Sequence, residues 1–254
     1  MKKTFRVIAK IDIKSKDVIK GINFEGMRVV GKANKLAEKY FFDGADELII
    51  NDVNASLFGR STALEFLKNC TKKIFIPVTL SGGLKNITDV RNALKSGADK
   101  VAINTAAVED KSIISKISRE FGSQALIISI NAKKISKNKW LVFTDKGREK
   151  KFLDAILWAK LAEKLGAGEI HVNSIDQDGT KRGFDYDLAK AISESIKVPL
   201  VIGGGLGNIE HIEKLLKIKN IEGISTSSAL HYRDLKIDEI KKAIFKQKIN
   251  VRLI

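Results

Sequence analysis

The chain has 254 residues, 44% of them hydrophobic, and a formal net charge of +16. This length suits one large barrel domain or two small domains with a sizeable core. No apolar run is long enough to span a bilayer, and Lys10 and Asp12 interrupt the short apolar stretch near the N-terminus, so we expect neither a membrane segment nor a signal peptide. The single cysteine, Cys70, excludes an intrachain disulfide and a CxxC metal site. We therefore expect a cytoplasmic protein without a metal or another cofactor.

The excess of lysine has two interpretations. A basic protein often binds nucleic acid, but these lysines are scattered over predicted helix faces, as in residues 240–244, and no aromatic–basic motif accompanies them. The pattern favours a solvated, lysine-rich surface over a nucleic-acid interface. It also favours anionic substrates.

Short β-branched runs alternate with longer amphipathic stretches. The runs predict strands at residues 7–12, 47–52, 76–81, 100–104, 126–131, 169–173, 200–203 and 223–226. The stretches predict helices that include residues 33–43, 89–96, 113–121, 153–165, 186–195 and 209–216. Regular alternation requires a parallel sheet, and eight units in about 250 residues fit a closed (β/α)₈ barrel, or TIM barrel, better than an open sheet. No linker divides the chain, so we expect a single domain over residues 1–254.

The chain also contains an internal repeat. The segment PVTLSGGLKNI at residues 77–87 reappears, 122 positions later, as PLVIGGGLGNI at residues 199–209. The same offset aligns residues 44–47 with 166–169 and Asn51 with Asn173, and the first strand aligns with the fifth. We therefore predict a (βα)₄ unit used twice, with equivalent residues facing each other across the barrel mouth.

Two glycine pairs follow the third and seventh predicted strands: Gly82 and Gly83 in one half, Gly204 and Gly205 in the other. Glycine lets the backbone approach a ligand, and a following helix N-terminus adds positive potential, so phosphate is the natural ligand. The alternative is that these glycines only make tight turns. The duplication favours two phosphate sites and an elongated ligand with a phosphate at each end. Further candidates for these sites are Asn104, Thr105, Asp178, Gly179, Ser227 and Ser228.

Asp12 and Asn131 end the first and fifth strands, on opposite sides of the barrel. Two aspartates in these places could act as general acid and base. Asparagine forms hydrogen bonds, but it does not exchange a proton as a carboxylic acid does. Asp176 also lies at a strand end, where a turn or helix-cap role explains it equally well.

Strand alternation predicts one inward-facing layer of alternating charge at the N-terminal mouth, made of Arg6, Glu47, Lys100 and Glu169. This layer could be a salt-bridge plug that closes the barrel, or a gate on an axial passage. The pattern alone favours the plug. Alternation also points His171 into the barrel.

Together these features resemble the cyclase subunit of imidazole glycerol phosphate synthase, the glutamine-dependent enzyme of histidine biosynthesis. The similar segments are residues 6–12, 20–24, 97–108, 121–124, 174–180 and 250–252, which sample nearly the whole chain. The resemblance implies a barrel that forms a heterodimer with a glutaminase at its N-terminal face. Ammonia would pass along the barrel axis to the C-terminal mouth. There a lyase reaction would convert a bis-phosphorylated ribonucleotide to imidazole glycerol phosphate and an aminoimidazole ribotide.

By position, the resemblance makes Asp12 a catalytic acid or base and places Asn131 where the family has its second catalytic aspartate. Lys20 would belong to a mobile loop, residues 14–34, that closes over the site. Asp99 would contact the glutaminase. The charged layer, Arg6, Glu47, Lys100 and Glu169, corresponds to the family's ammonia gate, so the resemblance favours the gate over the plug.

Departures from the family gather at the C-terminal mouth. Asn131 replaces an aspartate and Lys10 replaces a cysteine, whereas the gate and the partner face are retained. Further differences are Ser81, Ala102, His171 and Asn173. The pattern resembles family paralogues that accompany a glutaminase homologue and a sugar amidotransferase in surface-polysaccharide biosynthesis. There the barrel would pass ammonia to a third, amidotransferase protein at its C-terminal face for amidation of a nucleotide-sugar.

Three functions therefore stay open. The favoured one is an ammonia-conducting barrel subunit with weak or no cyclase activity of its own. The second is an authentic cyclase subunit of histidine biosynthesis, in which Asn131 orients a water. The third is a non-enzymatic scaffold that binds a phosphorylated metabolite. None of them involves nucleic acid or a membrane.

Overall fold

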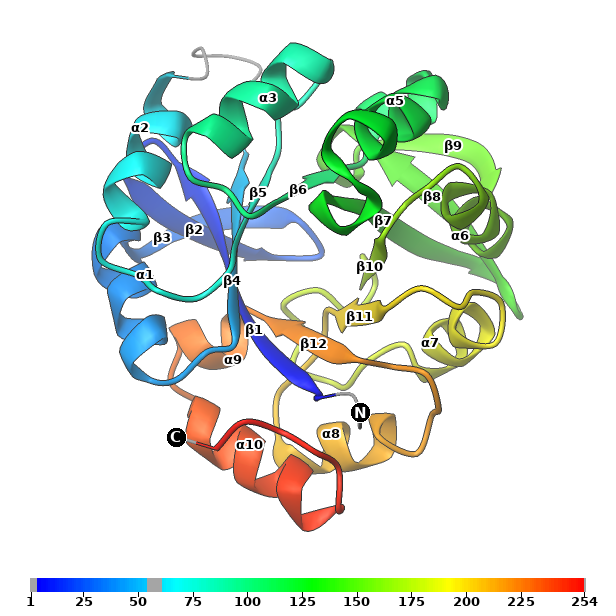
Figure 1. Cartoon of the computed structure of the whole chain (residues 1–254). Helices are drawn as coiled ribbons and strands as arrows, with labels where there is room; N and C mark the ends of the chain where they lie inside the picture. Colours follow the sequence, from blue (N-terminus) through cyan, green and yellow to red (C-terminus); the bar gives the residue numbers. More distant parts are fainter. Residues whose placement is uncertain (1–3, 54–60, 254) are drawn as a thin grey trace.

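A computed structural model describes residues 4–53 and 61–253, and its central feature is a closed barrel of parallel strands (Figure 1). Pairing of β12 with β1, and of β10 with β7, closes the cylinder. This confirms the predicted (β/α)₈ barrel. In order around the barrel, the strands are β1 (Arg6–Lys14), β4 (Glu47–Asp52), β5 (Val78–Ser81), β6 (Lys100–Ile103), β7 (Leu126–Ser136), β10 (Glu169–Ser174), β11 (Leu200–Gly203) and β12 (Gly223–Thr226).

Helices surround the barrel and bury its outer face (Figure 1). They are α1 (Ala33–Phe42), α2 (Ser61–Cys70), α3 (Ile87–Lys95), α4 (Thr105–Glu109), α5 (Ser112–Phe121), α6 (Ala155–Lys164), α7 (Tyr186–Ser193), α8 (Ile209–Leu215), α9 (Ser228–His231) and α10 (Ile237–Lys246), with the short 3₁₀ turns η1 (Ser123–Ala125) and η2 (Asp145–Gly147). The main core lies between the strands and these helices. A separate buried cluster of Ile8, Ile49 and Val201 comes from inward-facing strand positions. Within the described residues, no helix is long and apolar enough to cross a membrane.

The internal repeat is visible in local geometry. Helices α3 and α8 begin at equivalent caps, Asn86 (φ −149°, ψ 175°) and Asn208 (φ −147°, ψ 174°), and each cap forms a reciprocal capping box. Gly82 and Gly204 both have φ +89°. A Cβ atom would lie 2.2 Å from the Asp52 carbonyl oxygen at Gly82 and 2.9 Å from the Ser174 carbonyl oxygen at Gly204. Both positions therefore require glycine, for its backbone freedom and for the close approach.

Each half carries a β-hairpin after its first barrel strand. In the first half, β2 (Asp17–Ile22) and β3 (Glu25–Lys32) extend β1 as antiparallel strands. In the second half, β8 (Lys139–Thr144) and β9 (Glu149–Asp154) extend β7. The segment predicted as a loop, residues 14–34, therefore contains a β-hairpin. The hairpin turn uses Asn23 (φ 51°) and Phe24 (φ 66°), and an Asn-Phe pair is a much weaker turn signal than Asn-Gly.

Candidate functional site

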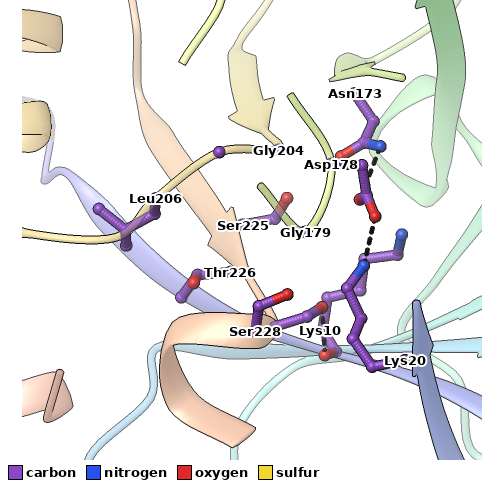
Figure 2. A pocket seen from close by; sticks show the side chains of 12 residues that line it. Lys10, Lys20, Asn173, Asp178, Gly179, Gly204, Leu206, Ser225, Thr226 and Ser228 are labelled. Carbon is purple, nitrogen blue, oxygen red and sulfur yellow. Dashed lines mark hydrogen bonds and ion pairs between the residues drawn. The ribbon is translucent and has the colours of Figure 1, made fainter. Parts of the chain in front are cut away.

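The C-terminal mouth holds a chain of alternating charges from four buried side chains. Lys20 Nζ lies 2.5 Å from Asp178 Oδ1 and 4.0 Å from Asp12 Oδ2. Lys10 Nζ lies 3.4 Å from the other oxygen of Asp12, Oδ1. Figure 2 shows Asp178 between Lys20 and Asn173, joined to both by dashed lines. The β2–β3 hairpin thus brings its lysine into contact with Asp12 of β1 and with Asp178 in the loop after β10.

These contacts determine the protonation of Asp12. Burial alone would raise the pKa of its carboxyl group, but the ammonium groups of Lys10 and Lys20 and a hydrogen bond from Asn51 outweigh burial, so the pKa lies below its ordinary value. Burial would likewise lower the pKa of Lys20, but Asp178 and Asp12 raise it above its ordinary value. Asp12 is therefore a carboxylate and Lys20 an ammonium at neutral pH.

Two amides complete the cluster. Asn51 Nδ2 donates to Asp12 Oδ1 at 2.7 Å, and Asn173 Nδ2 donates to Asp178 Oδ2 at 3.1 Å. These asparagines are the pair that the internal repeat aligned. Neither was predicted as a site residue. Their equivalent positions at strand ends, which the repeat aligns, were the feature that could have identified them.

Asn131 lies across the barrel from Asp12. On β7 it is in register with Asn173 of β10 on one side and with Phe143 of β8 on the other. The structure therefore places the two predicted catalytic positions on opposite walls of the mouth, one an ionised carboxylate and the other an amide.

His171 faces the barrel interior, as predicted. Its Nε2 lies 2.7 Å from Ser225 Oγ, and the ring is almost completely buried. Burial, with a contribution from the Lys10 ammonium, lowers its pKa to about 3. The imidazole is therefore neutral at physiological pH.

The predicted phosphate residues of the second half line a pocket at the mouth. Ser227 Oγ donates to the Lys10 backbone oxygen at 2.8 Å. The lining combines the two lysines with glycine loops and hydroxyl groups, and Figure 2 shows Lys10, Lys20, Asp178, Gly179, Gly204 and Ser228 around the pocket. Gly205 and Ser227 also line it. Asp178 accepts hydrogen bonds from Lys20 and Asn173, so it holds the lysine at this pocket.

The equivalent residues of the first half have different partners. Asn104 Nδ2 donates to the Phe143 backbone oxygen at 3.0 Å, and Thr105 Oγ1 accepts from the Asp145 backbone N–H at 3.2 Å. Gly82 and Gly83 have positive φ here too, at 89° and 67°. The end of β8 and the η2 turn therefore engage the polar side chains of this half.

The four-residue ring at the opposite end of the barrel is assembled as alternation predicted. Arg6 Nη1 lies 2.8 Å from Glu47 Oε1 and 2.9 Å from Glu169 Oε2. Lys100 Nζ lies 3.0 Å from Glu47 Oε2 and 3.5 Å from Glu169 Oε2. Each carboxylate thus bridges both cations. Burial would lower the pKa of Arg6, but the two carboxylates raise it above its ordinary value.

Asp99 lies at the same end and is exposed, and its Oδ2 accepts from the Val78 N–H at 2.8 Å. Sequence reasoning missed a similar residue, Asp46, which accepts from the Val7 N–H at 2.8 Å. Asp46 also binds the fully buried Lys241 (2.6 Å) and Arg252 (3.0 Å). This cluster joins β1 to the C-terminal segment.

Sequence reasoning also missed a pair behind the mouth. Tyr40 Oη and His231 Nδ1 are 2.5 Å apart, and the two rings stack at 5.8 Å between centroids. Burial lowers the pKa of His231 to about 4, although the nearby Asp12 carboxylate opposes this shift. Among the described residues, no group of three or more His, Cys, Asp or Glu side chains could hold a metal ion.

The chain is thus a (β/α)₈-barrel protein with a charged mouth at one end of the barrel and an ion-pair ring at the other. A family model described as "Histidine biosynthesis protein" matches residues 6–236. The chain is 47% identical, over 205 residues, to "Imidazole glycerol phosphate synthase subunit HisF" of Legionella pneumophila, covering 81% of this chain and 97% of that protein. It is 42% identical to the subunits of the same name from Endomicrobium trichonymphae, over 249 residues (98% and 95% covered), and from Sulfurisphaera tokodaii, over 248 residues (98% of each). The chain therefore belongs to the histidine biosynthesis protein family and is a relative of the HisF subunits.

Proposed function

We propose that this chain is the barrel subunit of a glutamine amidotransferase complex. A glutaminase partner binds the N-terminal face near Asp99, and ammonia passes the Arg6–Glu47–Lys100–Glu169 ring and leaves at the C-terminal mouth. Two facts support this proposal. The relatives are named as subunits of a synthase, and the ring lies at the end of the barrel axis opposite the mouth.

We further propose that cyclase activity is weak and that the ammonia serves a third, amidotransferase protein at the C-terminal face, for amidation of a nucleotide-sugar. The observation that carries this proposal is the pairing of Asp12 with Lys10 at 3.4 Å. A general acid or base works best when its pKa is near the operating pH, whereas the pKa of Asp12 is lowered further from neutrality. Asn131, opposite, has no proton to exchange. Loss of one general acid or base costs about 10²–10⁴-fold in rate.

The alternative is the reaction in the relatives' name: conversion of a bis-phosphorylated ribonucleotide and ammonia to imidazole glycerol phosphate. Identity of 42% over 98% of the chain favours this alternative. Asn131 would then orient a water molecule, and Asp12 would act as a base of low basicity.

The deciding experiment supplies the purified chain with that ribonucleotide and an ammonium salt, beside the Sulfurisphaera tokodaii relative. We expect turnover at least about 10²-fold slower than the relative's, and a rise in turnover in the double variant Lys10→Cys, Asn131→Asp. The single variants show which residue limits the rate. Wild-type turnover equal to the relative's would establish the cyclase alternative and reject impaired catalysis.

The partner is tested separately. A glutaminase homologue co-expressed with this chain should co-purify with it and should hydrolyse glutamine faster in its presence. Charge reversal by Asp99→Lys should weaken the complex, because Asp99 is exposed on the proposed face. A glutaminase that neither binds nor responds would reject the conduit and favour the scaffold.

A further inference from the structure

We propose that the second hairpin, residues 133–152, is a docking surface for an anionic lipid membrane. This hairpin consists of the end of β7, all of β8 and most of β9, and it extends the barrel wall beyond Asn131 at the C-terminal mouth. The proposal goes beyond the proposed function and does not rest on it.

The first observation is a local concentration of positive charge. The second hairpin has seven lysines and one arginine against two acidic residues, which gives it a net charge of +6. More than a third of the chain's net charge of +16 therefore lies in fewer than a tenth of its residues. Residues 133–139, around the β7–β8 turn, are exposed at every position and include four lysines and no acid. The excess of lysine is thus not evenly scattered over the surface.

The second observation is that most of these charges have no ion-pair partner in the fold. Lys134 Nζ lies 3.5 Å from Asp187 Oδ2, and Lys151 Nζ lies 2.7 Å from Glu149 Oε2. Among residues 4–53 and 61–253, no carboxylate is at ion-pair distance from the other six cations, which are Lys133, Lys137, Lys139, Lys146, Arg148 and Lys150. Their mutual repulsion opposes the compact state, and an anionic surface would relieve it.

The equivalent hairpin of the first half is different. Residues 14–32 have five basic and two acidic side chains, a net charge of +3. Two of those five cations are neutralised within the fold, Lys20 by Asp178 and Lys32 by Asp17. Because both hairpins extend their barrel strands in the same way, the free charge of the second hairpin is not a requirement of the architecture.

The third observation is that apolar side chains lie exposed among these cations. The Phe152 side chain is 94% exposed, and Lys150 Nζ lies 5.3 Å from the centre of its ring. Ile135 follows Lys134 in the exposed segment around the turn and is itself exposed. Lysines combined with exposed aromatic and aliphatic side chains are typical of surfaces that bind at the headgroup level of an anionic bilayer.

The composition of the hairpin favours lipid over nucleic acid. Seven of its eight cations are lysines, which act as point charges, whereas the planar group of arginine is the one suited to nucleic-acid recognition. An aliphatic side chain such as Ile135 does not stack on a base as an aromatic ring does, but it loses water on entering the headgroup region. With the second hairpin on a membrane, Asp99 at the opposite end of the barrel stays accessible to a partner.

The test is co-sedimentation of the purified chain with two kinds of vesicle. One is phosphatidylcholine alone, and the other is an equimolar mixture of phosphatidylcholine and phosphatidylglycerol. At about 0.1 M salt we expect binding to the mixed vesicles only, and at about 1 M salt we expect that binding to be lost, because screening shortens the reach of the charges. No binding to the mixed vesicles, or equal binding to both kinds, would overturn the proposal.

Two pairs of variants locate the surface. The double variant Lys137→Gln, Lys139→Gln should weaken binding to the mixed vesicles about 10–30-fold. Its control, Lys217→Gln with Lys219→Gln, removes the same charge from exposed positions before β12, at the opposite end of the barrel, and should leave binding unchanged. Equal weakening by both double variants would mean that only net charge matters, and would overturn the assignment to the hairpin.

The apolar contribution has its own control. Phe152→Ser should weaken vesicle binding at least about fivefold, because burial of an aromatic ring is lost. Phe75→Ser changes a ring that is 79% exposed before β5, at the N-terminal end, and should have no effect. A random-sequence RNA duplex that binds as tightly as the mixed vesicles, with no loss in Phe152→Ser, would reassign the surface to nucleic acid and overturn the proposal.

The outcome is separable from that of the proposed function. A chain that stimulates a glutaminase but does not bind the mixed vesicles would reject this inference alone. A chain that binds the vesicles through the second hairpin but neither binds nor stimulates the glutaminase would reject the conduit alone.

Discussion

Asn51 and Asn173 occupy equivalent positions in the two halves of the barrel, and each donates its side-chain amide to a buried carboxylate, Asp12 in one case and Asp178 in the other. The asparagines are equivalent by the repeat, but their carboxylate partners are not, because Asp12 aligns with Asn131 whereas Asp178 lies in the loop after β10. Lys20 of the β2–β3 hairpin lies between the two carboxylates. The duplicated asparagines thus hold two carboxylates that are not duplicated.

Removing Lys10 should change both the pKa of Asp12 and the stability of the fold. In Lys10→Met, burial opposes ionisation with one cation fewer, so the pKa of Asp12 should rise. Carboxyl ¹³C NMR measures this rise directly. Asp12 contributes stability above its unfolded pKa of about 3.9, and this contribution is lost as pH falls through the lower folded value. At neutral pH we expect a loss of about 1–3 kcal/mol in urea unfolding, because Lys20 and Asn51 still bind the carboxylate. An unchanged pKa would contradict the pairing.

The ion-pair ring should be far more sensitive than a surface pair. Arg6→Met leaves Glu47 and Glu169 with only Lys100, and we expect about 3–5 kcal/mol of destabilisation. The matched control is Arg91→Met, which breaks the exposed Arg91–Glu120 pair and should cost less than about 1 kcal/mol. Denaturant unfolding of both variants measures the difference. Similar small losses would mean that water screens the ring.

His171 should make stability depend on pH. Its folded pKa of about 3 lies below the ordinary 6.5, so between these values the unfolded chain binds the extra proton. Stability therefore falls as pH drops through this window, by up to about 1.4 kcal/mol per pH unit for this one group. His231, with a pKa of about 4, adds to the same slope. His171→Asn should reduce the slope in urea unfolding without abolishing it, and an identical slope would contradict a buried neutral imidazole.

The glycine loops should tolerate no side chain where their backbone lies closest to the backbone of a neighbouring segment. Gly82→Ala would place a Cβ atom 2.2 Å from the Asp52 carbonyl oxygen at a φ of +89°, so strain and overpacking should cost about 2–4 kcal/mol. Gly26→Ala is the matched control, since its φ is +60° and no atom lies within 4 Å of the added Cβ. That change should cost only about 1–2 kcal/mol, the price of a left-handed backbone. Thermal unfolding distinguishes the two, and equal losses would mean that backbone conformation alone requires glycine.

Local patterns were enough to predict much of this molecule. Strand alternation alone was enough to predict the ring of Arg6, Glu47, Lys100 and Glu169, because every second side chain of a parallel barrel strand points inward. The repeat predicted that the two glycine pairs are equivalent, and that Asn51 and Asn173 occupy equivalent positions in the two halves. The two hairpins were not predicted. The first lies in the segment predicted as a loop, and its Asn23–Phe24 turn lacks a glycine.

The barrel, its duplication and the residue types at the two mouths follow from periodicities of two residues in strands and from an offset of 122 positions, so they can be predicted from local pattern. Which charges meet depends on how distant segments fold together. Lys20 and Asp178 are 158 positions apart and come together because a hairpin folds over the strand ends. Lys10 was visible as a departure from the family, but its effect on Asp12 depends on a 3.4 Å separation in a buried site. Electrostatic energies depend on distance and on the exclusion of water, and neither is encoded in local pattern.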